Sequence, residues 1–338
     1  MPLLGMFSND IAIDLGTANT LIYMKGKGIV LNEPSIVTYD VASRKIIAIG
    51  EESKKMMGRV HKELATIRPM KDGVIADFEI AEGMIKEFIK KISSSWMPSR
   101  RIVICVPSGI TEVEKRAVRD TAEHAGAKEV YLISEPMAAA IGIGLDVMAP
   151  YGNMIVDIGG GTTEIAVIAL SGITNGTSIR IAGDELTESI IRFFRNNHNI
   201  LIGERTAEEI KCQVGSVMPL KEEVIIEVKG RDLVAGVPKI TEVSSIEIRE
   251  SLNAPVTQMI EAVKVALEKT APELSSDLLD RGIFLTGGGA LIKGLDERIK
   301  METGVPVHVA EDPLTAVARG TGKVLEDLDY FKKVLLRR

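Results

Sequence analysis

Two short segments about 140 residues apart repeat one pattern of residues. The first reads Asp14-Leu15-Gly16-Thr17-Ala18-Asn19-Thr20, and the second reads Asp157-Ile158-Gly159-Gly160-Gly161-Thr162-Thr163. Each segment follows a short apolar run and leads into another, which predicts two strands joined by a tight turn. Repeated sequence patterns are typical of folds that are built from related structural units. The pair therefore indicates a chain built from two related halves.

The residues of these turns suit an anionic ligand. Glycines permit positive φ angles and bring amide N–H groups close to an anion, while threonine hydroxyls add donors, a set that fits the triphosphate of a nucleotide. Asp14 and Asp157 would repel bare phosphate, but each suits a hydrated Mg²⁺, which keeps several waters and takes one or two carboxylates. We therefore expect one nucleotide between the halves. For either turn alone, an ordinary hairpin with a locally bonded aspartate is the alternative.

Several other classes of protein are disfavoured by the sequence. It contains no Gly-x-x-x-x-Gly-Lys-Ser/Thr phosphate loop, since Gly320-Thr321-Gly322-Lys323 lacks the first glycine. A net charge of −6 without a basic cluster argues against a nucleic-acid partner. The four histidines lack the spacing of metal ligands, and the two cysteines indicate a reducing cytoplasm rather than a disulfide framework.

The relation of the chain to membranes is expected to be peripheral. No run approaches the roughly 20 apolar residues of a membrane span, and the start lacks a signal-peptide pattern, so we expect a cytosolic protein. Two apolar features suit contact with lipid headgroups, one at the start and one in a polar turn before two arginines: Leu3, Leu4 and Phe7, then Trp96 and Met97. Single exposed apolar residues without function are the alternative.

The order of apolar patterns predicts an α/β fold. The 338 residues suffice for about two domains, and strand-like runs alternate with helical patterns in both halves. Segments 32–75 and 183–245 are expected to be insertions that flank a cleft. One expected helix has an apolar face formed by Phe78, Ile80, Met84, Ile85, Phe88, Ile89 and Ile92, and the next opens with a capping box of Thr111 and Glu114. Other expected helices are 184–197, 206–213 with a capping box of Thr206 and Glu209, 255–270, 291–301 and the C-terminal segment 330–338.

Glu135 is a candidate for placing a water. It ends the apolar strand-like run 130–133 and precedes Pro136, which suits the first turn of a helix. A carboxylate at a strand end is placed to orient the water that attacks a γ-phosphate. Helix capping or complementation of the helix dipole also favours an acidic residue there, so the residue alone leaves both interpretations open.

Two further segments are candidates for the nucleoside. Glu208 and Lys211 share a helical face, where they can hold ribose hydroxyls or form a surface ion pair. The run Gly287-Gly288-Gly289-Ala290 follows an apolar strand and offers bare backbone against which a flat base can lie. An ordinary strand-to-helix turn is the alternative for this run.

Taken together, these segments resemble a known superfamily over the whole chain. Asp14 to Thr20, Asp157 to Thr163, Glu135-Pro136 and Thr286 to Ala290 are similar, in order and spacing, to the phosphate 1, phosphate 2, connecting and adenosine motifs of the actin, sugar-kinase and heat-shock-chaperone ATPases. Within that superfamily, the amino-acid sequence of the chain resembles the MreB family of bacterial actin homologues. The segments that carry this resemblance are Ile-Asp-Leu-Gly-Thr-Ala-Asn-Thr, Asn-Glu-Pro-Ser, Arg-Pro-Met-Lys-Asp-Gly-Val-Ile-Ala-Asp-Phe and Glu-Pro-Met-Ala-Ala-Ala-Ile-Gly.

The resemblance implies an actin-like ATPase fold, with two ribonuclease-H-like halves around a nucleotide cleft. Four subdomains follow from it: IA at 1–31, 76–145 and 315–338; IB at 32–75; IIA at 146–182 and 246–314; and IIB at 183–245. It also implies ATP with Mg²⁺ and paired protofilaments on the inner face of the cell membrane. There the filaments would organise lateral wall synthesis with membrane-spanning elongation and wall-synthesis proteins, and so maintain rod shape.

The resemblance also implies roles for individual residues. Asp14 and Asp157 would meet Mg²⁺ through water, and Glu135 and Thr162 would place the attacking water. Glu208 and Lys211 would meet the ribose. The implied nucleotide contacts are Thr17, Ala18, Asn19, Thr20, Gly159, Gly160, Gly161, Thr162, Glu208, Lys211, Gly287, Gly288, Gly289 and Ala290.

One departure and two alternatives accompany the resemblance. Some members of the family begin with a longer amphipathic membrane helix, whereas a short apolar stretch precedes Asp10 here, which shifts the expected membrane contact towards Trp96 and Met97. A soluble small-molecule kinase or a chaperone-like switch ATPase would use the same cleft. Against the kinase, the sequence has no clear additional substrate segment; against the chaperone, it has no peptide-binding domain.

Overall fold

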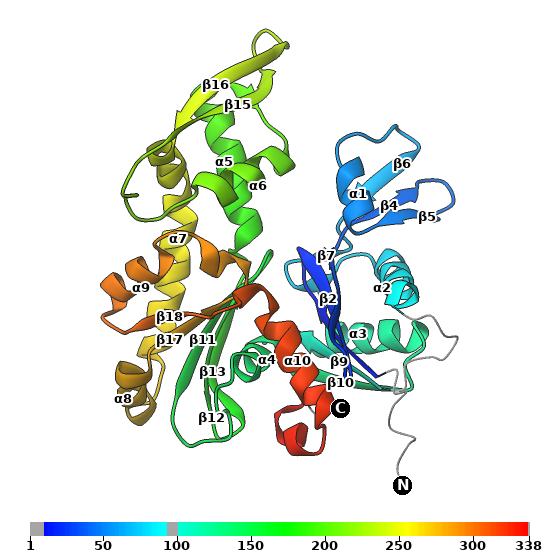
Figure 1. Ribbon diagram of the computed structural model, residues 1–338, viewed down its shortest axis with the longest axis vertical. Coiled ribbons are helices and arrows are strands. Elements are labelled where there is room, and N and C mark those ends of the chain that lie inside the picture. Colours follow the sequence, from blue (N-terminus) through cyan, green and yellow to red (C-terminus); the bar gives the residue numbers. More distant parts are fainter. Residues whose placement is uncertain (1–9, 93–100, 337–338) are drawn as a thin grey trace.

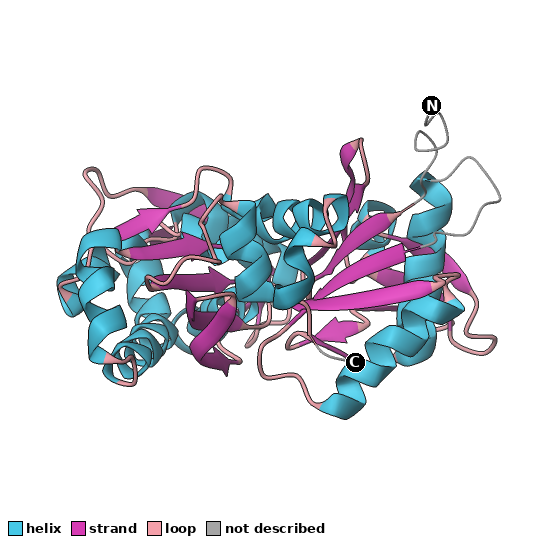
Figure 2. Ribbon diagram, turned by 90° about the horizontal axis from the view of Figure 1, so that it is seen from below, coloured by secondary structure: helices cyan, strands magenta, loops and turns pink. Residues whose placement is uncertain are grey.

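The structure, a computed structural model, describes residues 10–92 and 101–336. Two large halves lie side by side in Figure 1, and each carries a smaller region at its upper end. Viewed from below in Figure 2, the molecule is flattened, and helices flank the strands. The five membrane candidates Leu3, Leu4, Phe7, Trp96 and Met97 lie outside the described residues.

Two five-stranded sheets form the centres of the halves, and they share one topology. The first has the order β10-β9-β1-β2-β3, with strands Glu129–Ser134, Arg101–Val106, Ile11–Leu15, Asn19–Met24 and Gly28–Pro34. The second has the order β13-β12-β11-β17-β18, with strands Gly172–Ile179, Thr163–Ala169, Asn153–Ile158, Ile283–Thr286 and Val307–Val309. In both, three antiparallel strands are followed by two parallel ones. The prediction of two related ribonuclease-H-like halves is confirmed.

The two repeated segments join equivalent strands. Asp14 lies in β1 and Asp157 in β11, and each strand pairs antiparallel with the next through a tight turn. The turns therefore lie at equivalent corners of the two sheets, as the repeated pattern predicts.

Helices cover both sheets. In the first half these are α2 Phe78–Ile92, α3 Glu112–His124, α4 Glu135–Gly142 and α10 Ala316–Glu326; in the second they are α7 Ser245–Glu268, α8 Pro272–Arg281 and α9 Leu295–Thr303. The predicted apolar face of α2 is buried at Ile80, Met84, Ile85 and Phe88, whereas Phe78 at its start is exposed. α3 opens with the predicted capping box of Thr111 and Glu114.

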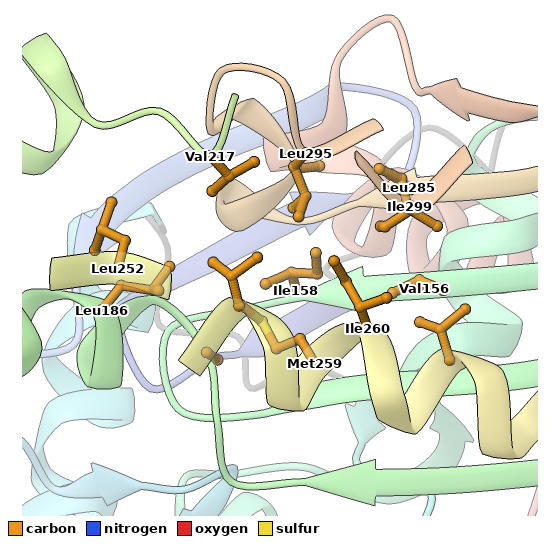
Figure 3. Close-up of a cluster of buried hydrophobic side chains, with 14 of the residues drawn as sticks. Val156, Ile158, Leu186, Val217, Leu252, Met259, Ile260, Leu285, Leu295 and Ile299 are labelled. Atoms are coloured by element: carbon orange, nitrogen blue, oxygen red, sulfur yellow. The ribbon is translucent and has the colours of Figure 1, made fainter. Parts of the chain in front are cut away.

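The core of the second half packs α7 and α9 around strand β11 (Figure 3). Val156 and Ile158 of β11 meet Met259 and Ile260 of α7, and all four side chains are at most 3% exposed. Burying such side chains contributes roughly 1.5–3 kcal/mol each, which fixes the position of β11 and of the turn that follows it.

Helices α4 and α10 pack unusually closely where the halves meet. A Cβ added at Gly142 would lie 1.8 Å from the carbonyl oxygen of Ala316, and one at Gly320 would lie 1.7 Å from that of Ala138. Only glycine permits this approach, so the two backbones touch directly.

Each half also carries a small sheet. The segment 32–75 contains β4 Val37–Asp40, β5 Ile46–Ile49, β6 Leu64–Ile67, helix α1 Glu51–Met56 and the pair β7 Met70–Lys71 and β8 Val74–Ile75. The segment 183–245 contains α5 Gly183–His198, β14 Ile200–Leu201, α6 Glu204–Val214, β15 Ile225–Asp232 and β16 Pro238–Ser244. Both regions lie at the top of Figure 1, on either side of a gap.

Several expected helix boundaries were wrong. α6 begins at Glu204 after the N-cap Gly203, so Thr206 lies inside the helix and forms no capping box. α7 begins at Ser245, ten residues before Pro255, because Ser244 and Glu247 supply its capping box and Pro255 is buried within it. The expected helix 291–301 is split by Gly294 (φ 79°) into the 3₁₀ helix η2 Gly288–Leu291 and α9.

Two short 3₁₀ helices complete the C-terminal part. η3 Pro313–Thr315 precedes α10, and η4 Tyr330–Val334 takes the place of the expected last helix. The chain then runs along the edge of the first sheet, where the Leu336 N–H donates to the Leu132 carbonyl over 2.8 Å. No helix in 10–92 or 101–336 is long and apolar enough to cross a bilayer.

Candidate nucleotide site

A cavity of about 500 Å³ lies between the halves and is lined by residues from both. Fifteen of the seventeen expected nucleotide, metal and catalytic residues line it: Asp14, Thr17, Ala18, Asn19, Glu135, Asp157, Gly159, Gly160, Gly161, Thr162, Glu208, Lys211, Gly287, Gly288 and Gly289. The fold thus brings together five segments that are far apart in sequence.

Thr20 and Ala290 do not line the cavity. Thr20 is fully buried on β2, where its hydroxyl is 2.9 Å from that of Ser35. The Ser35 hydroxyl in turn donates to the Gly16 carbonyl over 2.7 Å, so Thr20 supports the first turn from behind. Ala290 is 4% exposed and packs into the core of the second half.

The two repeated turns touch each other at glycines. A Cβ added at Gly160 would lie 2.8 Å from the Cβ of Ala18, and one at Gly161 would lie 2.8 Å from the hydroxyl of Thr17. The Thr17 hydroxyl accepts a hydrogen bond from the Gly73 N–H over 3.1 Å. Glycine is therefore required here by the close approach of the two turns, which leaves their backbones exposed to the cavity.

Three carboxyl groups face the cavity: Asp157 on β11 is buried, and Asp14 on β1 and Glu135 at the start of α4 are half-buried. Burial raises the pKa of Asp14 to about 6, although the Cys105 thiol donates to its Oδ1 over 3.2 Å. Burial raises the pKa of Asp157 to about 7, against the opposing effect of a 2.8 Å hydrogen bond from the Thr286 hydroxyl.

The pKa of Glu135 is raised well above its ordinary value, chiefly by burial and then by the neighbouring charges of Glu164, Asp157 and Asp14. Like charges that lie close together disfavour ionisation, and a bound cation reverses that effect. The described residues offer no group of three or more acidic, histidine or cysteine side chains that would hold a metal directly.

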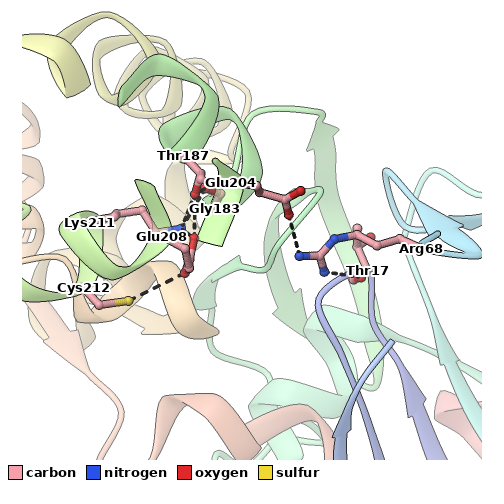
Figure 4. Close-up of polar contacts among 8 residues, drawn as sticks. All are labelled: Thr17, Arg68, Gly183, Thr187, Glu204, Glu208, Lys211 and Cys212. Carbon is pink, nitrogen blue, oxygen red and sulfur yellow. Dashed lines mark hydrogen bonds and ion pairs between the residues drawn. The ribbon is translucent and has the colours of Figure 1, made fainter. Parts of the chain in front are cut away.

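Glu208 and Lys211 form an ion pair and also line the cavity, and their contact with a ribose stays a prediction. Their charged groups are 2.7 Å apart on α6, and both reach towards α5, as Figure 4 shows. Burial alone would raise the pKa of Glu208, but the charge of Lys211 and hydrogen bonds from Lys211 and Thr187 bring it below its ordinary value.

Arg68 is a cavity residue that the sequence analysis missed. It lies between β6 and β7, and its guanidinium donates to the carboxylate of Glu204, on α6 of the other half, over 2.8 Å (Figure 4). A second N–H lies 3.5 Å from the Thr17 carbonyl. Arg68 is the first residue of the segment Arg-Pro-Met-Lys-Asp-Gly. No pattern in the sequence indicates that its side chain contacts the other half of the molecule.

Comparisons with known proteins agree with this geometry. The model of the MreB/Mbl protein family matches residues 8–333. The chain is 56% identical over 331 residues to the cell shape-determining protein MreB of Escherichia coli (strain K12), covering 96% of this chain and 95% of that protein. It is 50% identical over 329 residues to the cell shape-determining protein Mbl of Bacillus subtilis (strain 168), and the match covers 97% of this chain and 99% of that protein.

A solved structure gives the same result. The crystal structure of MreB5 of Spiroplasma citri bound to AMPPNP superposes with a TM-score of 0.91 at 36% identity, covering 95% of this chain and 97% of that one. A small-molecule kinase or a chaperone-like switch is not favoured, because the relatives are cell shape-determining proteins. The chain belongs to the MreB/Mbl family of actin-like cytoskeletal proteins that determine cell shape.

Proposed function

We propose that the chain binds Mg·ATP in the cavity and hydrolyses it, and that hydrolysis controls its assembly into paired actin-like filaments. The observation that carries the proposal is the meeting of two glycine turns and three carboxyl groups with raised pKa values at one cavity. The turns offer backbone donors to phosphate oxygens, and the carboxyl groups require a cation to ionise together. A related structure is bound to AMPPNP, a nucleotide of this class.

The residues divide into groups by their chemistry. Asp14 and Asp157 would hold Mg²⁺ through its waters, because this ion takes one or two carboxylates and keeps several waters. The ion would neutralise phosphate charge. Glu135 and Thr162 would orient the attacking water, while the turns at 16–19 and 159–162 would bind the phosphates. Gly287, Gly288 and Gly289 would lie against the adenosine.

The location proposed for the filaments is the inner face of the cell membrane. The apolar residues Leu3, Leu4, Phe7, Trp96 and Met97 support this part of the proposal through their amphipathic sequence context. Membrane-spanning elongation and wall-synthesis proteins would be the partners there, and no nucleic acid is expected. We also propose the subdomain boundaries stated above, with the small sheets as IB and IIB.

Electron microscopy of the purified protein with Mg·ATP on anionic vesicles tests the proposal, with neutral vesicles as the control. Paired filaments lying on the anionic membrane are expected. Glu135→Ala should assemble but release phosphate slowly, because positioning of the water is lost while the binding turns remain. Monomers that bind neither nucleotide nor lipid at all concentrations would contradict the proposal.

A further inference from the structure

Ser35 lies directly behind the first glycine turn, which comprises residues 16–19 and borders the cavity. The residue is fully buried and does not line the cavity itself. Its hydroxyl donates to the Gly16 carbonyl over 2.7 Å, and its backbone N–H donates to the Ala18 carbonyl over 2.9 Å. A single residue therefore holds two carbonyl groups of the turn on the side away from the cavity.

The other two carbonyl groups of the first glycine turn also face protein donors. The Asn19 carbonyl accepts from the Gly16 N–H over 3.1 Å. The Thr17 carbonyl lies 3.5 Å from an N–H of Arg68 (Figure 4). The N–H groups of Thr17 and Ala18, in contrast, donate to no acceptor in the part of the chain that the structure describes. Occupied carbonyls beside two consecutive unoccupied amides are the arrangement of an anion-binding nest.

The geometry of the peptide group links the Ser35 hydroxyl to one of these two amides. In a planar trans peptide, the C=O of one residue and the N–H of the next point in opposite directions. The Ser35 hydroxyl fixes the Gly16 carbonyl towards the buried side. The Thr17 N–H therefore points the other way, and Thr17 lines the cavity.

Ser35 is itself held in place by contacts outside the cavity. Its only hydroxyl hydrogen is used on the turn, so the Thr20 hydroxyl, 2.9 Å away, donates to it. Two residues earlier, the Glu33 carboxylate accepts from the Glu51 N–H at the start of α1 over 2.8 Å and pairs with Lys91 of α2 over 3.1 Å. The segment that carries Ser35 is thus anchored on two helices behind the turn.

We infer that Ser35 is a positioning residue: its hydroxyl orients the peptide group after Gly16 so that the Thr17 N–H donates to a phosphate oxygen of the nucleotide. The inference rests on the proposed binding of ATP, and Ser35 makes no contact with the nucleotide itself. Without the hydroxyl, the Gly16 carbonyl loses its donor and can recover one only from water. A carbonyl turned towards the cavity withdraws the Thr17 N–H and brings a partial negative charge towards the phosphates.

The first test is isothermal titration calorimetry with Mg·AMPPNP on the wild type, Ser35→Ala and the matched control Ser53→Ala. Ser53 is also fully buried, and its hydroxyl lies 2.6 Å from that of Thr38, away from the cavity lining. Both substitutions remove one buried hydroxyl that meets a threonine, so they should lower stability alike. Ser35→Ala should weaken binding about tenfold, which corresponds to about 1.4 kcal/mol, and Ser53→Ala should leave it unchanged.

The second test is residue-resolved hydrogen–deuterium exchange at saturating Mg·AMPPNP, which separates positioning of the amide from a general loss of stability. In the wild type and in Ser53→Ala, the nucleotide should slow exchange of the Thr17 N–H at least about tenfold. In Ser35→Ala, the slowing should fall below about threefold, although the site is filled. Ser35→Cys keeps a weak donor at the same place and should lie between the two; it serves if Ser35→Ala does not fold.

Each other outcome overturns a defined statement. A Thr17 N–H that is protected in Ser35→Ala as in the wild type would overturn the inference about Ser35, and so would equal losses of affinity in Ser35→Ala and Ser53→Ala. A wild-type protein that binds AMPPNP without protecting the Thr17 N–H would overturn the role of that amide but leave nucleotide binding intact. A wild-type protein that binds neither AMPPNP nor ATP would overturn the proposed function itself.

Discussion

Asp157→Asn should stabilise the protein when it is free of nucleotide and magnesium. The wild-type carboxylate is buried and carries an unfavourable charge, since its pKa rises from 3.8 to about 7 on folding. Asparagine keeps the shape and the oxygen that accepts from Thr286, but removes the charge. The substitution therefore isolates the free-energy cost of ionising this one group.

The magnitude follows from the difference between the two pKa values. One pKa unit corresponds to about 1.4 kcal/mol, so the fully ionised group costs the folded state about 4 kcal/mol above pH 8. Because the folded pKa lies above the unfolded one, the wild-type stability is intact below the unfolded pKa and falls as pH rises through about 7. At pH 5 the expected advantage of the variant shrinks to roughly 2 kcal/mol.

Urea unfolding at pH 5 and pH 8, in EDTA and without nucleotide, measures this effect, with the exposed Asp280→Asn as the control. Addition of Mg·ATP should then stabilise the wild type more than Asp157→Asn, since the variant lacks a metal-facing carboxylate. The reasoning is refuted if the variant is no more stable than wild type at pH 8, or if its advantage does not decrease at pH 5.

Three other changes have defined outcomes. Glu135→Gln should slow phosphate release at least about 100-fold while filaments still form, and an unchanged rate would remove Glu135 from the reaction. Glu204→Gln breaks the half-exposed pair with Arg68 and should speed nucleotide exchange roughly two- to fivefold in stopped-flow fluorescence; no change would mean that the pair does not restrain the cleft. Gly320→Ala should cost at least about 3 kcal/mol or prevent folding, whereas Gly203→Ala, whose Cβ meets nothing within 4 Å, should fold normally by circular dichroism.

Local patterns predicted the elements of the fold better than their ends. The period of α2 and the capping box of α3 are local signals, and both appear in the structure. The start of α7 was missed, although the capping box of Ser244 and Glu247 is visible in the sequence. A proline in a long buried helix is tolerated when tertiary packing offsets the lost hydrogen bond, and packing is not readable from a single sequence.

The candidate site could be predicted where the motifs are repeated or glycine-rich. Asp14 and Asp157 were found because two turns share one pattern. Arg68 was missed because its function depends on its partner Glu204, 136 positions later, and that pairing exists only after the halves close around the cavity. The hydrogen bonds from the Lys211 ammonium to the Gly183 carbonyl and the Thr187 hydroxyl were also missed, because these acceptors lie on α5, 28 and 24 positions earlier in the chain.

The two halves are held together unequally on the two sides of the cavity. On one side, the chain crosses between the halves after α4 and again before α10, and these two helices touch at Gly142 and Gly320, where no Cβ fits. On the other side, the described residues provide the half-exposed pair Arg68–Glu204, and such pairs contribute about 0–1 kcal/mol. The weaker side should open first, with α4 and α10 acting as the hinge. A ligand that contacts the turns of both halves therefore changes the separation of the small sheets before it disturbs the two large ones.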